Sequence, residues 1–269
     1  TNPPADPAMV PLVISPLFFG FAVARIKEEL AQALLTLLNG LVETMLVIVG
    51  WVLAVAPIGI AALAFGAGAR LGAGVLGAFA QYIAIVAACC LAATLLAYLW
   101  AAILGRISPL RFARASLSAQ AVALGTQSSL ATLPVMVEAA RALDVPEERT
   151  AIVLPMAVSL FRAASVAANV AVTLYLAHLH AVPIGPGQLA LIALVAVPVS
   201  LGAVGLPAQV SFFATIAPVC IAAGVPVTAL PLLLAIEAIP DLFRTVGNVT
   251  NDIAIACAAG RSSPRKIGF

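Results

Sequence analysis

The chain has 269 residues, of which 63% are hydrophobic and 9% are charged, and its mean hydropathy is +1.15. Water-soluble domains carry about 25% charged residues, and a soluble fold of this length could not bury so much apolar surface. We therefore expect lipid to surround much of the protein. The net charge of +2 is too small to indicate nucleic-acid binding. The four cysteines lie in apolar segments without zinc-ligand spacing, and we interpret them as small core side chains.

The first half contains long apolar segments, and a bilayer crossing needs about 20 such residues. Residues 9–24 form the first candidate, with two prolines that could break or tilt it. A long helix is expected over roughly 29–56 and another span over 75–104. Between them, the Gly-rich stretch at 66–74 predicts a turn, and a basic loop is expected at 105–114.

The second half is interrupted by small residues and prolines. Residues 115–145 and 188–224 each contain such a stretch, SSLATLP and AVGLPAQ, between apolar arms too short to span separately. Irregular backbone is not tolerated in lipid, so these two tips must be buried in protein or line a wet cavity. Corresponding breaks in two halves indicate an inverted repeat with a binding site near the midplane. An interrupted span is expected over 150–180 and a last span over 226–260.

Basic residues in the loops predict the orientation, because Lys and Arg favour the cytoplasmic side. Two spans separate the first basic cluster from the second, so both can lie on one side. The C-terminal tail should lie there too, which requires an even number of crossings after residue 115. Two full spans plus two segments that enter and leave on one side fit this rule, and four full crossings fit equally. The three clusters are Arg25 and Lys27; Arg106, Arg111 and Arg114; and Arg261, Arg265 and Lys266.

The motif AIPDLFRTVGNVTNDIA, at 238–254, concentrates charge in the last apolar span. Asp241 and Arg244 lie on one helix face, and ionisable residues inside a membrane are costly and usually functional. Arg244 offers a planar fork to a carboxylate, and Asp241 a counter-charge to an ammonium. The alternative is a mutual salt bridge. Glu237, one turn earlier, is a candidate proton carrier or a structural acid paired with a neighbouring polar group.

The tips carry the remaining polar candidates. Ser128 and Ser129 would present hydroxyls and backbone N–H groups to a carboxylate, or they are simply small residues that let helices approach. Gly205 and Pro207 at the second tip would shape a lid, or only break the helix.

These motifs, TQSSLATLP, SLGAVGLPAQ and DLFRTVGNVTND, resemble in order the dicarboxylate/amino acid:cation symporter family, which includes the glutamate transporters. The resemblance implies that residues 1–72 are the remainder of a trimerising scaffold and 73–262 most of a mobile transport domain. Within that domain it implies hairpin 1 at about 115–145, a broken span at 150–180, hairpin 2 at about 188–224 and a last span at 226–260. Family members move this domain across the membrane like an elevator. The family's first three spans have no counterpart, and the absence of an initial Met favours a fragment.

The resemblance also assigns residues. It implies that Arg244 holds the side-chain carboxylate of the substrate and Asp241 its amino group, with Thr245 and Asn248 as further contacts. The full predicted substrate set is Ser128, Ser129, Ser165, Gly205, Pro207, Asp241, Arg244, Thr245 and Asn248. The residues predicted for cation sites, or for a group that replaces a cation, are Arg162, Asn248, Asp252, Ser159, Ser200 and Ala203.

The chain departs from the family at FRAAS, residues 161–165, where members usually read N-M-D-G-T. Phe161 and Ala163 replace two oxygen ligands, and a hard cation needs about six. We expect Arg162 to replace at least one sodium ion with a fixed charge, within about 4 Å of Asp252. The alternative is that Arg162 points toward a hairpin or a water-filled crevice and binds nothing specific.

We therefore expect an all-α, multi-pass protein of the cell membrane with two re-entrant helical hairpins in inverted repeat, the core of an elevator-type symporter for an acidic amino acid or dicarboxylate. Alternatives are a sodium-independent, proton-coupled transporter or exchanger, and a binding or sensing relative that does not transport. No enzyme is expected, because HExxH, GxSxG and a paired acid with a nucleophile are missing from the sequence. We expect no cofactor and no metal beyond sodium; the coupling ion is sodium or a proton. The expected partners are a small anionic substrate, the lipid bilayer and the other copies of a homotrimer, without nucleic acid.

Overall fold

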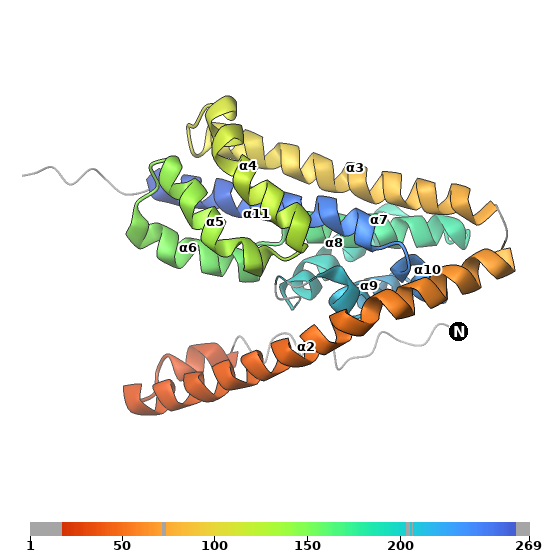
Figure 1. Cartoon of the computed structure of the whole chain (residues 1–269), viewed down its shortest axis with the longest axis horizontal. Helices are drawn as coiled ribbons and strands as arrows, with labels where there is room; N and C mark the ends of the chain where they lie inside the picture. The colour runs from red at the N-terminus through yellow and green to blue at the C-terminus, as the bar shows by residue number, and fades with distance from the viewer. Residues whose placement is uncertain (1–17, 72–73, 203–204, 206, 262–269) are drawn as a thin grey trace, which may run out of the picture.

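A computed structural model describes residues 18–71, 74–202, 205 and 207–261 of the chain. Every regular element in these residues is a helix, and the described part contains no strand (Figure 1). The all-α prediction is therefore confirmed for the described residues. An all-helical architecture suits a lipid environment, because each helix satisfies its backbone hydrogen bonds internally.

Two long helices form the first half. Residues 18–23 are helical, and α2 (Glu28–Leu71) and α3 (Gly74–Ile103) follow. At 44 residues, α2 is longer than the predicted helix over 29–56, and it runs through most of the Gly-rich stretch predicted as a turn at 66–74. Alanines alternate with these glycines and keep the local helix propensity high enough for the helix to continue.

The second half consists of shorter helices, most of them joined by only a few residues. α4 already begins at Pro109, inside the basic loop predicted at 105–114, because the Ser108 hydroxyl accepts a hydrogen bond from Arg111 N and proline is favoured in the first helical turn. The helices are α4 (Pro109–Thr126), α5 (Ser129–Ala142), α6 (Glu147–Leu160), α7 (Ala163–Leu179), α8 (Pro186–Leu201), α9 (Ala208–Ala222), α10 (Leu230–Leu234) and α11 (Ala238–Arg261).

The last predicted span, 226–260, is divided into two helices. Between α10 and α11, residues 235–237 form a turn whose backbone N–H groups bond to carbonyls three residues earlier. Pro240, in the first turn of α11, is compatible with a new helix start there. Glu237 consequently lies at the junction of the two helices, with its carbonyl accepting from Asp241 N at 3.0 Å.

Helix α11 is the centre of the bundle. It packs against α3 along much of its length and also contacts α4, α5, α6 and α7. Figure 1 shows α3 and α11 running side by side, with α4, α5 and α6 grouped at one end and α7, α8, α9 and α10 toward the other. The long α2 contacts mainly α9, α10 and α3, and its first half extends away from the bundle.

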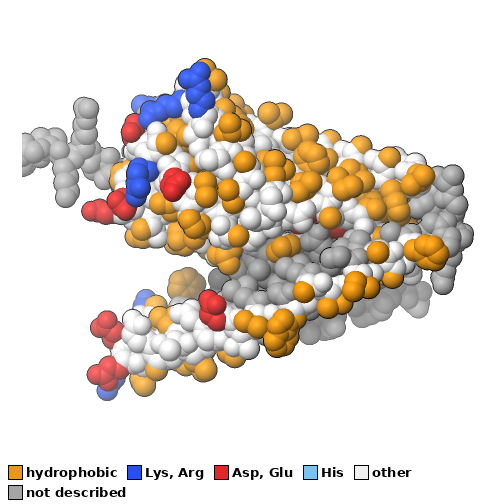
Figure 2. All heavy atoms as spheres, in the orientation of Figure 1, with side chains coloured by type: hydrophobic (Ala, Val, Ile, Leu, Met, Phe, Trp, Pro, Cys, Tyr) orange, Lys and Arg blue, Asp and Glu red, His pale blue; other side chains and the backbone are white. Residues whose placement is uncertain are grey.

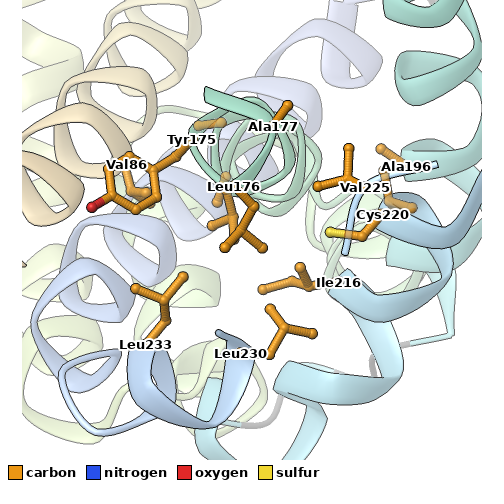
Figure 3. Packing of buried hydrophobic residues seen from close by; sticks show 14 of the residues in the cluster. Val86, Tyr175, Leu176, Ala177, Ala196, Ile216, Cys220, Val225, Leu230 and Leu233 are labelled. Carbon is orange, nitrogen blue, oxygen red and sulfur yellow. The ribbon is translucent and has the colours of Figure 1, made fainter. Parts of the chain in front are cut away.

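Two clusters of buried apolar side chains hold the bundle together. The first joins α3, α7, α8, α9 and α10, and Figure 3 shows Leu176, Ile216 and Leu230 pointing into one interior space. The second joins α3, α4, α5, α6 and α11 around Phe112 and Met136. The residues between α6 and α7 therefore lie where one cluster gives way to the other.

The outer surface is apolar and its charges gather at one end. By length and composition, two segments of the described residues could cross a membrane, Leu76–Ile103 and Glu147–Leu179. Large apolar side chains such as Leu91, Leu95 and Leu99 are exposed along α3. Most charged side chains visible in Figure 2 lie at one end of the molecule, where α2 begins and where α3 and α11 end (Figures 1 and 2). This arrangement agrees with the shared side predicted for the first two basic clusters; the side chains of the third, Arg261, Arg265 and Lys266, lie outside the described part of the structure.

Candidate functional site

A narrow polar cavity lies among α7, α8, α9 and α11, beside the break between α6 and α7. Its volume is about 10 Å³, which is room for about one water molecule. Helical spacing brings its lining together, since the contributing residues of α7, α9 and α11 recur three or four positions apart. The lining residues are Arg162, Ser165, Asn169, Ser200, Ala208, Ser211, Thr215, Asp241 and Arg244.

Arg244 lies between two buried carboxylates. Its Nη2 is 2.5 Å from Glu237 Oε1, and its Nη1 is 3.5 Å from Asp241 Oδ1. The Tyr82 hydroxyl donates to Glu237 Oε2, and Ala208 N donates to Asp241 Oδ2 at 2.8 Å. The alternative role expected from the sequence for Asp241 is a salt bridge with Arg244, and the alternative role expected for Glu237 is a pairing with a neighbouring polar group. The observed contacts correspond to these two alternatives. The ligand and proton-carrier roles of these residues stay predictions.

Arg162 occupies the two-residue break between α6 and α7, and it is only 7% exposed. Its Nη2 donates to the Ser165 hydroxyl at 3.2 Å. Its Nε and Nη1 have no hydrogen-bond partner among the described residues. The side chain lines the cavity that also contains Asp241 and Arg244. A permanent charge thus faces this space.

The predicted contact between Arg162 and Asp252 is wrong. No ion pair within 4 Å joins them, although both belong to the described residues. The cause is the length of α11: Asp252 lies eight residues beyond Arg244, which is about 12 Å along a helix axis, whereas Arg162 faces the Arg244 end. Both Asp252 carboxylate oxygens are buried without a hydrogen-bond partner in the described part of the chain.

Asn248 and Ser165 fasten α11 to the first turn of α7. Asn248 Oδ1 accepts from Ser165 N at 3.1 Å, and its Nδ2 donates to the Ser165 hydroxyl at 2.8 Å. The first N–H groups of a helix have no partner within the helix, so Asn248 supplies one. Thr245, one turn earlier on α11, is also buried. Asn248 therefore fixes the geometry of the break that carries Arg162, and it does not itself line the cavity.

The two predicted tips meet each other. The Ser128 hydroxyl donates to Gly205 O at 2.9 Å, and Leu130 N lies 3.5 Å from the same oxygen. Gly205 has a φ of +37°, and an added Cβ would lie 3.1 Å from Leu130 N, so both conformation and space favour glycine. Ser128 also accepts from Ala131 N and caps α5, while Ser129 is buried beside it. The predicted tip residues Ser128, Ser129 and Gly205 are therefore outside the cavity lining.

The family assignment follows from comparison with known proteins. The model of the sodium:dicarboxylate symporter family matches residues 2–262. The chain belongs to this family. It is 28% identical to human excitatory amino acid transporter 1 over 245 residues, which cover 90% of this chain and 45% of that protein. It is 28% identical to human neutral amino acid transporter A over 259 residues, covering 90% of this chain and 46% of that protein.

This membership confirms the resemblance drawn from the motifs. The family is one of membrane transporters and not of enzymes. The chain spans about half the length of the curated relatives it matches. Human excitatory amino acid transporter 3 matches a shorter stretch, 32% identical over 148 residues, which is 55% of this chain and 28% of that protein.

Of the other residues predicted for this symporter-family chain, some line the cavity and some lie elsewhere. Ser200 lines the cavity and accepts from Asn169 Nδ2 at 3.1 Å, whereas the Ser159 hydroxyl bonds to Pro155 O in its own helix. Pro207 precedes α9 in the N-cap position. Ala203 lies outside the described residues. Four lining residues were not predicted from the sequence: Asn169, Ala208, Ser211 and Thr215.

A sequence signal existed for most of the missed residues. Asn169 follows Ser165 by four positions in an otherwise apolar helix, and Thr215 follows Ser211 in the same way. Such pairs lie on one helix face. Ala208 has no polar side chain and contributes its backbone N–H to Asp241, so no sequence pattern pointed to it.

Proposed function

We propose that this chain forms the substrate-binding part of a secondary active transporter in the cell membrane, a symporter for an acidic amino acid or a dicarboxylate. The observation that carries the proposal is a buried polar cavity lined by two arginines, Arg162 and Arg244, and one acid, Asp241. Buried charges in apolar surroundings are costly and are usually kept for function. Membership in the sodium:dicarboxylate symporter family and the similarity to excitatory amino acid transporter 1 support it.

In this proposal Arg244 binds a carboxylate and Asp241 balances the ammonium of an amino acid. A guanidinium presents a planar set of donors that matches a carboxylate. Because the cavity holds about one water molecule as it stands, a four-carbon ligand requires the helices that wall it to separate. Arg244 then exchanges part of its contact with Glu237 or Asp241 for the ligand.

We extend the proposal to the elevator mechanism. Residues 1–72 would belong to a scaffold that forms a homotrimer, and 73–262 to a domain that carries the substrate across the bilayer. The α4–α5 and α8–α9 pairs would be re-entrant hairpins, since each is interrupted at a tip and the tips touch through Ser128 and Gly205. The sparse packing of α2 against the α11-centred bundle supports two parts that move against each other.

Flux measurements test this function. The full-length protein in proteoliposomes should accumulate radiolabelled L-aspartate or succinate when an inward cation gradient is imposed, and uptake should stop when the gradient is dissipated. A binding or sensing relative would bind the same ligand in detergent but show no uptake above protein-free liposomes, and that result would refute the transport proposal.

A second candidate is a sodium-independent transporter coupled to protons, or an exchanger. The observation favouring it is the α6–α7 break, where Phe161 and Ala163 contribute no side-chain oxygen and Arg162 adds a fixed positive charge. A fixed charge holds a site together but carries no energy from a sodium gradient. Glu237 is the proton-carrier candidate, because it is fully buried and burial favours the neutral, protonated form of a carboxyl group.

A ligand titration in sodium buffer and in sodium-free choline buffer separates the two candidates. The second candidate predicts similar affinities in both buffers, and uptake that follows a proton gradient and is lost in Glu237→Gln. A tightening by sodium of about a hundredfold, equivalent to about 2.8 kcal/mol, would favour sodium symport instead.

A further inference from the structure

The two arginines of the cavity are balanced very differently. Arg244 faces the carboxylates of both Glu237 and Asp241. Arg162 has no carboxylate within 4 Å in the described residues, and its one hydrogen bond goes to the neutral Ser165 hydroxyl. Arg162 therefore has no carboxylate in ion-pair contact in the described part of the chain, and Asp252 and Asp241 balance its charge only from a longer distance.

Helix stability does not explain why Arg162 is there. It stands directly before the first residue of α7, a helix of 17 residues. The N-terminal end of a helix carries partial positive charge, so a guanidinium there is unfavourable, whereas an anion there is stabilised. The position thus combines a buried cation, free donors on two nitrogens and a helix end, and all three favour an anion.

We propose that Arg162 is a ligand-binding and specificity-determining residue, which holds a carboxylate of the substrate at the side of the cavity away from the Glu237–Arg244 pair. This inference rests on the proposed function, since it takes the cavity to be the substrate site. A ligand with two carboxylates places one on Arg162 and one on Arg244. Dicarboxylates without an amine should therefore bind better than amino acids.

The same geometry disfavours an ammonium group. Two guanidiniums line a space that holds about one water molecule, so an ammonium would lie close to two like charges. Asp241 is the lining carboxylate that could offset them, and its two oxygens already face Arg244 Nη1 and Ala208 N. The ammonium of an amino acid must compete with Arg244 and Ala208 for the Asp241 oxygens, whereas a dicarboxylate makes no demand on those oxygens.

Isothermal titration of the purified full-length protein tests the proposal with succinate and L-aspartate as probes. The unaltered protein should bind succinate more tightly than aspartate, and the reverse order would overturn the inference without any variant. Arg162→Met should weaken succinate binding by about a hundredfold, as expected when one partner of a buried charge pair is removed. Aspartate binding should change by less than about tenfold, because two effects of the substitution oppose each other. The aspartate carboxylate loses the Arg162 donor, while the aspartate ammonium is no longer repelled by the Arg162 charge.

Methionine is the first choice because an apolar side chain of similar length is tolerated at buried sites better than an unpaired polar group. Arg162→Lys, which keeps the charge, should restore the preference for succinate. The control is Arg141→Gln at an exposed ion pair with Glu147, which should leave both affinities unchanged. Equal losses for both ligands in Arg162→Met, accompanied by a lower unfolding temperature, would show a structural role and overturn the proposal.

Binding and uptake separate this inference from the proposed function. Succinate binding that depends on Arg162 in a protein without uptake would refute transport and support the role of Arg162. Uptake with an unchanged ratio of the two affinities in Arg162→Met would refute the role of Arg162 and leave transport standing.

Discussion

Asp241 connects two elements as well as facing the cavity. One carboxylate oxygen is 3.5 Å from Arg244 Nη1 and the other accepts from Ala208 N at the start of α9. Its negative charge is therefore shared between the cavity and the contact of α11 with α9. The role of Asp241 in the cavity can be distinguished from its role in the contact of α11 with α9, because only the role in the cavity depends on the charge of the ligand.

For Asp241→Asn we expect aspartate binding to weaken at least about tenfold more than succinate binding, a difference of about 1.4 kcal/mol. The ammonium loses its counter-charge, whereas the dicarboxylate meets a more positive cavity. Titration of both ligands against the variant measures the ratio. Equal losses would mean that Asp241 only holds Arg244 and α9 in place.

Tyr82 supports the acid behind Arg244. In Tyr82→Phe, Glu237 Oε2 loses its donor while remaining buried, which costs about 1–3 kcal/mol. The matched control is Tyr175→Phe, because the neighbouring Tyr175 ring lies 5.3 Å away and its hydroxyl donates to a neutral acceptor, Ala78 O. The unfolding temperature in detergent should fall more for Tyr82→Phe; an equal or larger fall for Tyr175→Phe would contradict this role of the hydroxyl.

Sequence spacing predicted part of this site. The three-residue separation of Asp241 and Arg244 placed both on one face of α11, and both line the cavity. The partner of Arg162 could not be predicted in this way. Arg162 lies in a helix break, and its surroundings come from α8, α9 and α11, which are distant in sequence, so its direction depends on tertiary packing.

At the scale of elements, the break between α6 and α7 is held in place by close helix packing. An added Cβ at Gly247 would lie 2.6 Å from Ala164 Cβ and 3.0 Å from the Thr94 hydroxyl. Gly247 thus allows α11 to pack tightly against both α7 and α3.

The sequence predicted the breaks from their small residues and prolines. It also predicted a turn at 66–74, yet α2 continues as a helix through most of that stretch, because local composition does not reveal whether a helix continues.

Gly247→Ala should destabilise the protein by about 1–3 kcal/mol through overpacking, despite the better helix propensity of alanine. Gly125→Ala is the control, because nothing lies within 4 Å of the added Cβ there and no loss is expected. The unfolding temperature in detergent reports both effects. An unchanged temperature for Gly247→Ala would show that α7 can move away from α11 without cost.

At the scale of the whole molecule, the charges divide into two groups. The basic loops and exposed ion pairs lie at one end of the bundle (Figure 2), while the charges of the cavity are buried within it. The outer surface along the sides of the bundle is apolar, as contact with lipid requires. Composition predicted this apolar outer surface, whereas the shared basic end was predicted from the loop residues and the buried charges from the motif at 238–254.

The most direct test of the account is a cryo-EM map of the full-length protein with saturating succinate, compared with a map of the ligand-free protein. We predict additional density in the cavity between Arg162 and Arg244, with the walls from α7, α9 and α11 moved apart. Ligand density elsewhere, or an unchanged cavity under conditions in which titration shows full occupancy, would contradict the claim that this cavity is the substrate site.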